Sequence, residues 1–369
     1  MNRFTTDISA QTITIDDISY TADECRMSLP EAFRKRYGGE SFHAALADFL
    51  AEWFSPSPTL CVHTSGSTGT PKKLWVEKRR MMNSAMMTVD FLGLARGDSA
   101  MLCMPLQYIA GKMVVIRSLV AGLNLIPVAP CGHPMKNTLP PVFSAMIPMQ
   151  VFNTLQVEEE CKRLKSIRHL IIGGGAIDRS LAQTLKTFPN NVWSTYGMTE
   201  TLSHIALRKL SGNEASEWYT PFANVCLSLT PDGTLAIEAP SVNPERLVTN
   251  DIVTFNDRGQ FRILGRRDNT INTGGIKVQI EQVEETLRMH LHHPFLITCA
   301  PDVKFGERIV LLVENLPADS TEIRQAIDTL PVYWRPKQII TVGRLPLTGT
   351  EKPDRAAAKR IATEKTKES

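Results

Sequence analysis

A polar loop at residues 64–73 carries the residue types that bind phosphate. Its ten residues, Thr-Ser-Gly-Ser-Thr-Gly-Thr-Pro-Lys-Lys, directly follow an apolar run at residues 59–63. Gly66 and Gly69 let the backbone turn several N–H groups toward one point, five hydroxyls add donors and acceptors, and Lys72 adds positive charge. Such a junction of strand and loop is where α/β proteins bind anions, so we predict a phosphate site here.

The spacing in this loop differs from the mononucleotide-binding pattern G-x-x-x-x-G-K-[ST]. If that pattern began at Gly66, its second glycine would fall on Pro71, and no hydroxyl follows the two lysines. Clusters of Ser, Thr and Gly are also common in turns without a ligand. The loop therefore indicates a phosphate site of another kind, and its interpretation depends on segments further along the chain.

Two later polar segments also follow predicted strands. Three glycines at residues 173–175 precede a helix expected near Asp178, and they either let the backbone approach a flat ligand or form a tight turn. Residues 196–200 (Tyr-Gly-Met-Thr-Glu) place a hydroxyl, Thr199, beside a carboxylate, Glu200. This pair could hold a phosphate and its magnesium, because Mg²⁺ prefers few protein oxygens together with substrate phosphates.

Alternating strands and helices must position these segments. Residues 98–129 alternate short apolar runs with a helical stretch, which is typical of βαβ units and a mainly parallel sheet. Residues 42–53 and 82–92 show helical spacing, and the methionines of the second stretch are expected to pack in the core. Ligands of parallel sheets lie beyond the carboxyl ends of the strands, where the polar segments are also predicted.

The chain changes character after Gly233. Apolar and polar residues alternate over residues 234–239 and 247–264 around an Asn/Asp/Gly turn, which predicts antiparallel strands. Asp251 interrupts a strand that otherwise consists of Val, Thr and Ile, and it needs a reason to be there. A polar break at residues 265–269 predicts a linker to a second, smaller α+β domain.

Composition excludes several classes of protein. The 369 residues contain 41 Lys plus Arg against 38 Asp plus Glu, so no strong field favours nucleic acid or an anionic membrane. Seven cysteines are scattered singly, as expected for reduced thiols in a cytosol. The most apolar stretch, residues 113–128, is interrupted by Arg117 and is too short to span a bilayer. We therefore expect a cytoplasmic protein without membrane insertion or nucleic-acid partners.

Six short motifs occur along the chain in order: residues 64–72, 196–200, 249–251, 265–268, 274–275 and 348–352. In these motifs the chain resembles the adenylate-forming superfamily of acyl-CoA synthetases, peptide-synthetase adenylation domains and luciferases. The resemblance implies an α/β fold with a large N-terminal domain (1–267) of layered, mainly parallel sheets and a small antiparallel β subdomain. A smaller, mobile α+β C-terminal domain (268–369) follows, with its hinge at Asp268.

The resemblance also implies a two-step reaction with ATP, Mg²⁺ and CoA. A carboxylate attacks the α-phosphate to give an acyl-adenylate and pyrophosphate, and the CoA thiolate then displaces AMP in the ligase branch. The implied catalytic residues are Lys352, Thr199 and Glu200, of which Glu200 binds magnesium. The residues implied to bind ATP are Thr64, Ser65, Gly66, Ser67, Thr68, Gly69, Lys72, Gly173, Gly174, Gly175, Tyr196, Asp251 and Arg266. Tyr196 is expected to stack on adenine and Asp251 to accept from the ribose, while Gly274 and Gly275 line the CoA tunnel.

Residues 108–112, 172–177 and 203–207 are similar to compact o-succinylbenzoate–CoA ligases of menaquinone synthesis. That substrate is a dicarboxylic acid, and its second carboxylate needs a cation or a hydroxyl as partner. The candidates are Tyr108, Lys112, Arg117, Ser203, His204 and Arg208, each of which also has a plain interpretation as a surface or core-edge residue.

The chain departs from the superfamily pattern in two places. Many members carry a longer segment before the phosphate loop, so we expect a trimmed N-terminal domain. Residues 105–108 read Pro-Leu-Gln-Tyr where many members have Pro-Leu-Phe-His, which alters the expected gate of the acyl pocket. Another aryl- or acyl-CoA synthetase, or an adenylation enzyme that loads a carrier protein, remains an alternative. The sequence leaves a homodimer open.

Overall fold

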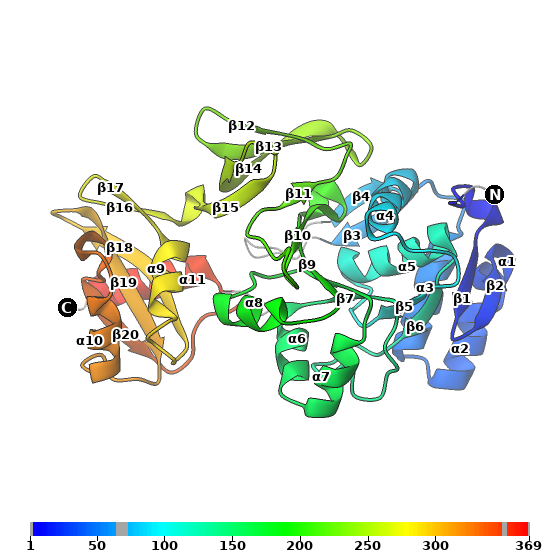
Figure 1. Ribbon diagram of the computed structural model, residues 1–369, viewed down its shortest axis with the longest axis horizontal. Helices are drawn as coiled ribbons and strands as arrows, with labels where there is room; N and C mark the ends of the chain where they lie inside the picture. The colour runs from blue at the N-terminus through cyan, green and yellow to red at the C-terminus, as the bar shows by residue number, and fades with distance from the viewer. Residues whose placement is uncertain (1–2, 64–72, 349–352, 368–369) are drawn as a thin grey trace.

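The structure, a computed structural model, describes residues 3–63, 73–348 and 353–367 as a large N-terminal part and a smaller C-terminal part (Figure 1). The two parts have separate apolar cores. The buried side chains of the first core end at Phe261, and those of the second begin at Ile271. The domain boundary predicted at residue 268 lies between these two cores.

A nine-stranded sheet, counted over the described residues, forms the centre of the N-terminal part. From one edge to the other its strands are β11 (Thr220–Pro221), β10 (His204–Lys209), β9 (Asn191–Gly197), β8 (His169–Ile172), β7 (Phe143–Met146), β5 (Ser99–Leu102), β6 (Asn124–Pro127), β1 (Thr12–Ile15) and β2 (Ile18–Thr21). The strands from β9 to β1 run parallel, and the edge strands are antiparallel. The predicted mainly parallel sheet is thus confirmed.

Helices form two cores against this sheet (Figure 1). One core contains side chains of α1 (Ala22–Met27), α2 (Leu29–Tyr37), α3 (Phe42–Trp53), α4 (Lys78–Leu92) and α5 (Ile109–Ala121). The other contains side chains of α6 (Pro148–Leu155), α7 (Glu158–Lys165) and α8 (Arg179–Lys186). Successive residues of a strand point to opposite faces, so Ile171 of β8 belongs to the first core and Leu170 and Ile172 to the second.

Helix α5 is buried along its length from Gly111 to Ala121. A Cβ atom at Gly111 would lie 2.5 Å from the carbonyl oxygen of Pro105, so only glycine allows the helix this close to the loop before it. The βαβ unit predicted over residues 98–129 is confirmed as β5, α5 and β6, with the two strands parallel. Arg117 belongs to α5 and is therefore buried in the core.

The apolar run before the phosphate loop is a strand, but it does not belong to the large sheet. It forms β3 (Thr59–His63), which pairs antiparallel with β4 (Lys73–Glu77) from Thr59 and Glu77 to His63 and Lys73. The segment between the two strands, residues 64–72, lies outside the described residues. The two strands that flank this segment therefore pair with each other, separately from the large sheet.

The small antiparallel sheet predicted after Gly233 is confirmed. Its strands are β12 (Cys226–Leu229), β13 (Thr234–Ala239), β14 (Asn243–Phe255) and β15 (Phe261–Arg266). At the turn between β14 and β15, the Asn256 side-chain oxygen accepts from the amides of Arg258 and Gln260. Asn residues commonly close a turn in this way.

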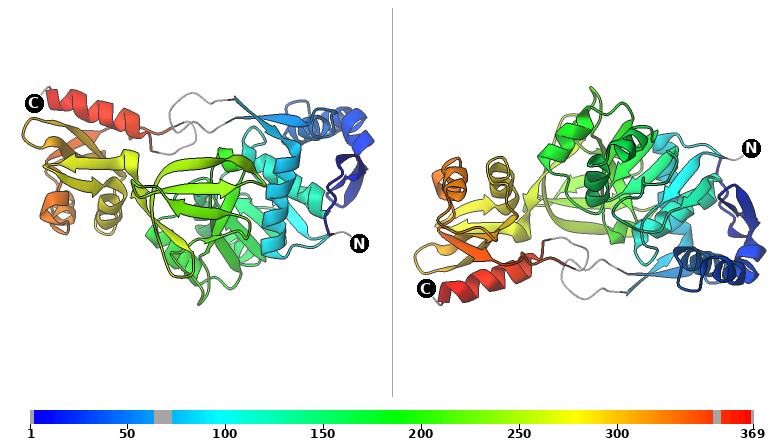
Figure 2. Two further views of the ribbon diagram at one scale, coloured as in Figure 1. Left: turned by 90° about the horizontal axis from the view of Figure 1, so that it is seen from above. Right: turned by 90° about the horizontal axis from the view of Figure 1, so that it is seen from below.

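The C-terminal part has its own sheet, in the order β17, β16, β19 and β18, with β20 parallel to β19. Its elements are β16 (Thr270–Thr273), β17 (Ile276–Gln279), α9 (Ile280–Leu287), β18 (Phe295–Asp302), β19 (Gly306–Glu314), α10 (Thr321–Asp328), β20 (Gln338–Val342) and α11 (Arg355–Lys367). Helix α11 has its N-terminal end toward the N-terminal part (Figure 2), whereas the β16–β17 hairpin extends to the far side (Figure 1). Over the described ranges, no helix combines the length and apolarity needed to cross a membrane.

Candidate active site

Tyr196 and Asp251 come from two different sheets and meet at a hydrogen bond. Tyr196 lies near the end of β9, and its hydroxyl donates to Asp251 Oδ2 at 2.5 Å. The Tyr196 ring is 8% exposed and makes edge-to-face contacts with Tyr219 and Phe261. Burial, together with the neighbouring carboxylate of Asp251, raises the pKa of Tyr196 above its ordinary value, so the hydroxyl keeps its proton.

Arg266 extends this contact toward the predicted hinge. It stands opposite Asp251 in the β14–β15 register and donates from Nη1 to Asp251 Oδ1 at 3.2 Å. Its Nε and Nη2 hold the two oxygens of Asp268 at 2.9 Å each. Burial acts to raise the pKa of Asp268, but the hydrogen bonds and charge of Arg266 outweigh it and lower that pKa.

Asp251 keeps the capacity to bind a ligand in this network. Each of its oxygens accepts one hydrogen bond from within the protein, from Tyr196 or from Arg266. An ionised carboxylate offers about four lone-pair sites, so two remain for hydroxyl donors. This explains why a carboxylate stands in an otherwise apolar strand, and it suits a partner with adjacent hydroxyls.

Thr199 and Glu200 follow β9 in the short helix η2 (Thr199–Thr201). The side chain of Glu200 is exposed, and within the parts of the chain that the structure covers no cation pairs with it. Its backbone carbonyl accepts from the side-chain amide Nδ2 of Asn243 at 3.0 Å, which ties η2 to β14. One exposed carboxylate beside a hydroxyl fits a magnesium ion that takes its remaining ligands from water and phosphates.

The glycines at residues 173–175 have a structural reason within the protein. A Cβ at Gly173 would lie 2.4 Å from Thr195 Oγ1 on the neighbouring strand β9. Gly174 has a φ of +80°, which side chains rarely adopt. Gly174 and Gly175 are exposed, so both interpretations of the segment, a tight turn and a ligand surface, agree with this geometry. The helix expected near Asp178 is α8, and Asp178 caps it by accepting from Leu181 N.

A buried polar cluster joins α4, α5 and β10. Arg117, which is 2% exposed, donates from Nη2 to Ser203 Oγ at 2.7 Å. Ser203 Oγ lies 3.3 Å from His204 Nδ1, and His204 Nε2 lies 3.0 Å from Thr88 Oγ1. The structure thus brings three predicted acyl-site residues together and adds Thr88, which the sequence reasoning missed because a lone threonine in a methionine-rich helix gives no signal.

The charge in this cluster is uncompensated. Across the described segments no carboxylate pairs with Arg117, and its Nε has no hydrogen-bond partner. Burial lowers the pKa of Arg117 to about 9, so the guanidinium stays charged at neutral pH. Burial and the charge of Arg117 lower the pKa of His204 well below its ordinary value, so the imidazole stays neutral. A buried cation beside neutral donors is suited to an anionic ligand.

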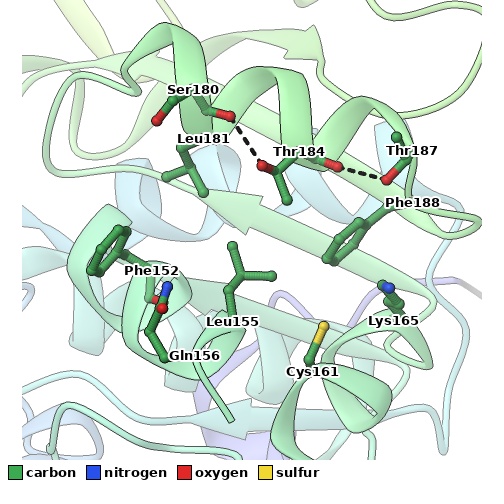
Figure 3. A pocket seen from close by; sticks show the side chains of 10 residues that line it. All are labelled: Phe152, Leu155, Gln156, Cys161, Lys165, Ser180, Leu181, Thr184, Thr187 and Phe188. Atoms are coloured by element: carbon green, nitrogen blue, oxygen red, sulfur yellow. Dashed lines mark hydrogen bonds between the residues drawn. The ribbon is translucent and has the colours of Figure 1, made fainter. Parts of the chain in front are cut away.

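The other acyl-site candidates lie apart from this cluster. Lys112 Nζ contacts the Cys61 carbonyl at 3.4 Å and lies 3.8 Å from Glu52, which favours its plain interpretation as a core-edge residue. Tyr108 is the N-terminal flanking residue of α5, and the Arg208 guanidinium lies over the Tyr219 ring. The groove of about 280 Å³ between α6, α7 and α8 (Figure 3) contains none of the predicted site residues.

Several predicted residues cannot be placed. Thr64, Ser65, Gly66, Ser67, Thr68, Gly69, Lys72 and Lys352 lie outside the described residues. Gly274 and Gly275 form the turn between β16 and β17, with φ values of +60° and +83° that favour glycine. In this arrangement their hairpin points away from the side of the C-terminal part that bears the start of α11 (Figure 1).

Comparisons with known proteins identify the family of the chain. The family model described as AMP-binding enzyme matches residues 16–226. A probable 2-succinylbenzoate–CoA ligase from Mycobacterium tuberculosis is 28% identical over 339 residues, which cover 84% of this chain and 85% of the relative. A crystal structure of an acyl-CoA synthetase (AMP-forming)/AMP-acid ligase II-like protein from Dyadobacter fermentans is 30% identical with a TM-score of 0.60, covering 88% of this chain and 95% of that one. The Bacillus subtilis o-succinylbenzoate CoA synthetase in complex with the acyl-adenylate intermediate OSB-AMP shares the fold, with a TM-score of 0.75 over 96% of each chain at 17% identity. This chain therefore belongs to the family of AMP-binding enzymes.

Proposed function

We propose that this protein is an ATP-dependent ligase that joins 2-succinylbenzoate to CoA through an acyl-adenylate, with release of AMP and pyrophosphate. The product belongs to menaquinone biosynthesis. Relatives named 2-succinylbenzoate–CoA ligase support the reaction. The observation that carries the choice of acid is Arg117, which is buried and has no carboxylate partner among the residues that the structure describes.

The position of Arg117 supports its role toward the second carboxylate of the acid. Its hydrogen-bond partner Ser203 is only three residues after Glu200 in the sequence. Glu200 is the residue beside which the phosphates of the nucleotide are proposed to lie. Burying a cation without a partner costs several kcal/mol, and the carboxylate of a dicarboxylic acid would offset that cost. An acid with a single carboxylate, which reacts with ATP, would have no second carboxylate to offset the cost of burying the Arg117 guanidinium.

The remaining roles follow the chemistry of each side chain. Glu200 would hold Mg²⁺ against the phosphates, Thr199 would bond the α-phosphate, and Asp251 would accept from the ribose hydroxyls beside its partner Arg266. The magnesium ion, when bound, supplies charge neutralisation for the phosphates. Lys352 would place an ammonium between the attacking carboxylate and the α-phosphate, and Gly274 and Gly275 would border the CoA arm.

The proposal is tested with the purified chain, 2-succinylbenzoate, ATP, Mg²⁺ and CoA. The expected products are the thioester, AMP and pyrophosphate, measured by mass spectrometry and a pyrophosphate assay. Turnover of benzoate or fatty acids without turnover of 2-succinylbenzoate would refute the proposed substrate. It would not contradict the proposed reaction class. Adenylation without any CoA thioester would identify a carrier-loading enzyme instead.

The role of Lys352 is tested in the two half-reactions. Lys352→Ala should lower adenylation by on the order of 10²–10³, the range for a lost transition-state donor. Conversion of a supplied acyl-adenylate to the thioester should continue. Equal loss of both half-reactions would contradict the assignment of Lys352 to the first step.

A further inference from the structure

Arg355 and Glu284 form a buried ion pair at the start of α11. Arg355 Nη1 and Nη2 donate to the two oxygens of Glu284 at 2.5 and 2.8 Å, and Nη1 also donates to the Ile297 carbonyl at 3.1 Å. Glu284 on α9 is 1% exposed and also accepts from Ile297 N at 2.9 Å. A two-point contact between a guanidinium and a carboxylate fixes direction as well as distance.

The chain just before Arg355 is closed into a loop by short-range contacts. Leu347 and Pro353 form an isolated antiparallel bridge, and Asp354 N donates to the Pro346 carbonyl at 3.0 Å. Asp354 also caps α11 by accepting from Ala357 N at 2.9 Å. Lys352 lies outside the described residues, but it immediately precedes Pro353 in the sequence and is therefore covalently joined to a residue of this bridge.

The ion pair joins the base of this loop, at Arg355, to the C-terminal core. Glu284 sits between Val283 and Leu287 in the buried face of α9, and the Ile297 strand β18 lies in the same core. The Gly274–Gly275 turn is held differently, by its own hairpin pairing and by Gly274 N donating to the Phe305 carbonyl at 2.8 Å.

We propose that Arg355 and Glu284 are positioning residues that set the direction in which the Lys352 loop leaves the C-terminal core. The inference rests on the proposed function, because the proposed function assigns Lys352 to the adenylation step. Loss of the ion pair should misplace the Lys352 ammonium and impair adenylation. The Gly274–Gly275 turn, which is proposed for the thioester step, should keep the hydrogen bonds that hold it.

The test compares half-reactions of the full-length protein carrying Arg355→Lys or Glu284→Gln. Each variant should lower the kcat of acid-dependent ATP–pyrophosphate exchange by on the order of 10²-fold, the loss expected for a misplacement of about 1 Å. The KM for ATP and the rate of thioester formation from a supplied acyl-adenylate should stay within about twofold. Arg355→Lys retains the charge but not the two-point contact, and Glu284→Gln retains the shape but not the charge.

Lys359→Met provides the matched control. Lys359 lies one turn further along α11 and pairs with Glu307 at 2.9 Å, so its loss removes an ion pair of the same helix without touching the base of the loop. This variant should keep both half-reactions, and the unfolding midpoints of all three variants should be measured alongside.

A parallel fall of both half-reactions in Arg355→Lys and Glu284→Gln, or no fall in either, would overturn the inference. Any acid that the wild-type chain adenylates can be used. A wrong choice of acid would therefore refute the substrate proposal alone, and the ratio of the half-reactions would still decide the positioning role.

Discussion

Asp251 and Arg266 face each other across β14 and β15, with Arg266 Nη1 3.2 Å from Asp251 Oδ1. The same guanidinium holds Asp268 through two hydrogen bonds. A single cation therefore contacts both the proposed ribose acceptor and the proposed hinge. Ligand binding at Asp251 and the position of Asp268 are thereby physically connected through one side chain.

Asp251→Asn should weaken ATP binding. The amide keeps the shape of the side chain but offers fewer acceptor sites and no charge, so we expect the Kd for ATP to rise about tenfold, equivalent to roughly 1.4 kcal/mol. Isothermal titration of ATP with the full-length protein measures the effect directly. Asp232→Asn is the control, since Asp232 pairs with Arg267 at the surface. An equal change in both variants would argue against the ribose role.

Arg117→Met should raise the KM for the acid and leave the KM for ATP unchanged. Loss of a hydrogen bond to a charged group costs about 1.5–3 kcal/mol, which corresponds to roughly 10- to 150-fold. Lys112→Met removes another buried cation, one that already contacts protein partners, and should not change the KM for the acid. If the two variants changed that KM alike, Arg117 would have no special role toward the acid.

His204 should make the protein less stable in mild acid. Its pKa is lowered in the folded protein, so the unfolded chain binds a proton first as the pH falls. The stability from the neutral imidazole is complete above the unfolded pKa of about 6.5 and declines below it, by at most about 1.4 kcal/mol per pH unit. His204→Gln should reduce the slope of the unfolding free energy plotted against pH between about pH 6.5 and 5. An unchanged slope in chemical denaturation would contradict this.

Gly275→Leu should block the second half-reaction while sparing the first. A leucine must adopt a φ of +83° and would fill the space beside the turn. Pyrophosphate release with ATP and the acid should persist, and thioester formation from a supplied acyl-adenylate should fall. Gly233→Leu, at a φ of +75° in a surface turn of the N-terminal part, controls for strain alone. Loss of both half-reactions in Gly275→Leu would contradict a role confined to CoA.

The amino-acid sequence determined much of the local structure and the chemical inventory of the site. The strand limits of β13, the βαβ unit around α5 and the Asp178 cap of α8 follow from short-range periodicity and capping chemistry. The order of the six motifs predicted the adenylate-forming fold, because residue types and spacing are read directly along the chain.

Only the tertiary structure decided which of these residues meet. Arg117 and Ser203 are 86 positions apart, and their contact depends on the fold that brings α5 next to the residue before β10. Likewise β3 pairs with β4 outside the parallel sheet, and Tyr196 reaches Asp251 on a separate sheet. Sheet order, register and side-chain partners arise from contacts distant in sequence, so local patterns do not determine them. For that reason the sequence could name Arg117 as one of several candidates, and only the fold distinguished it among them as a buried cation with no carboxylate partner in the described residues.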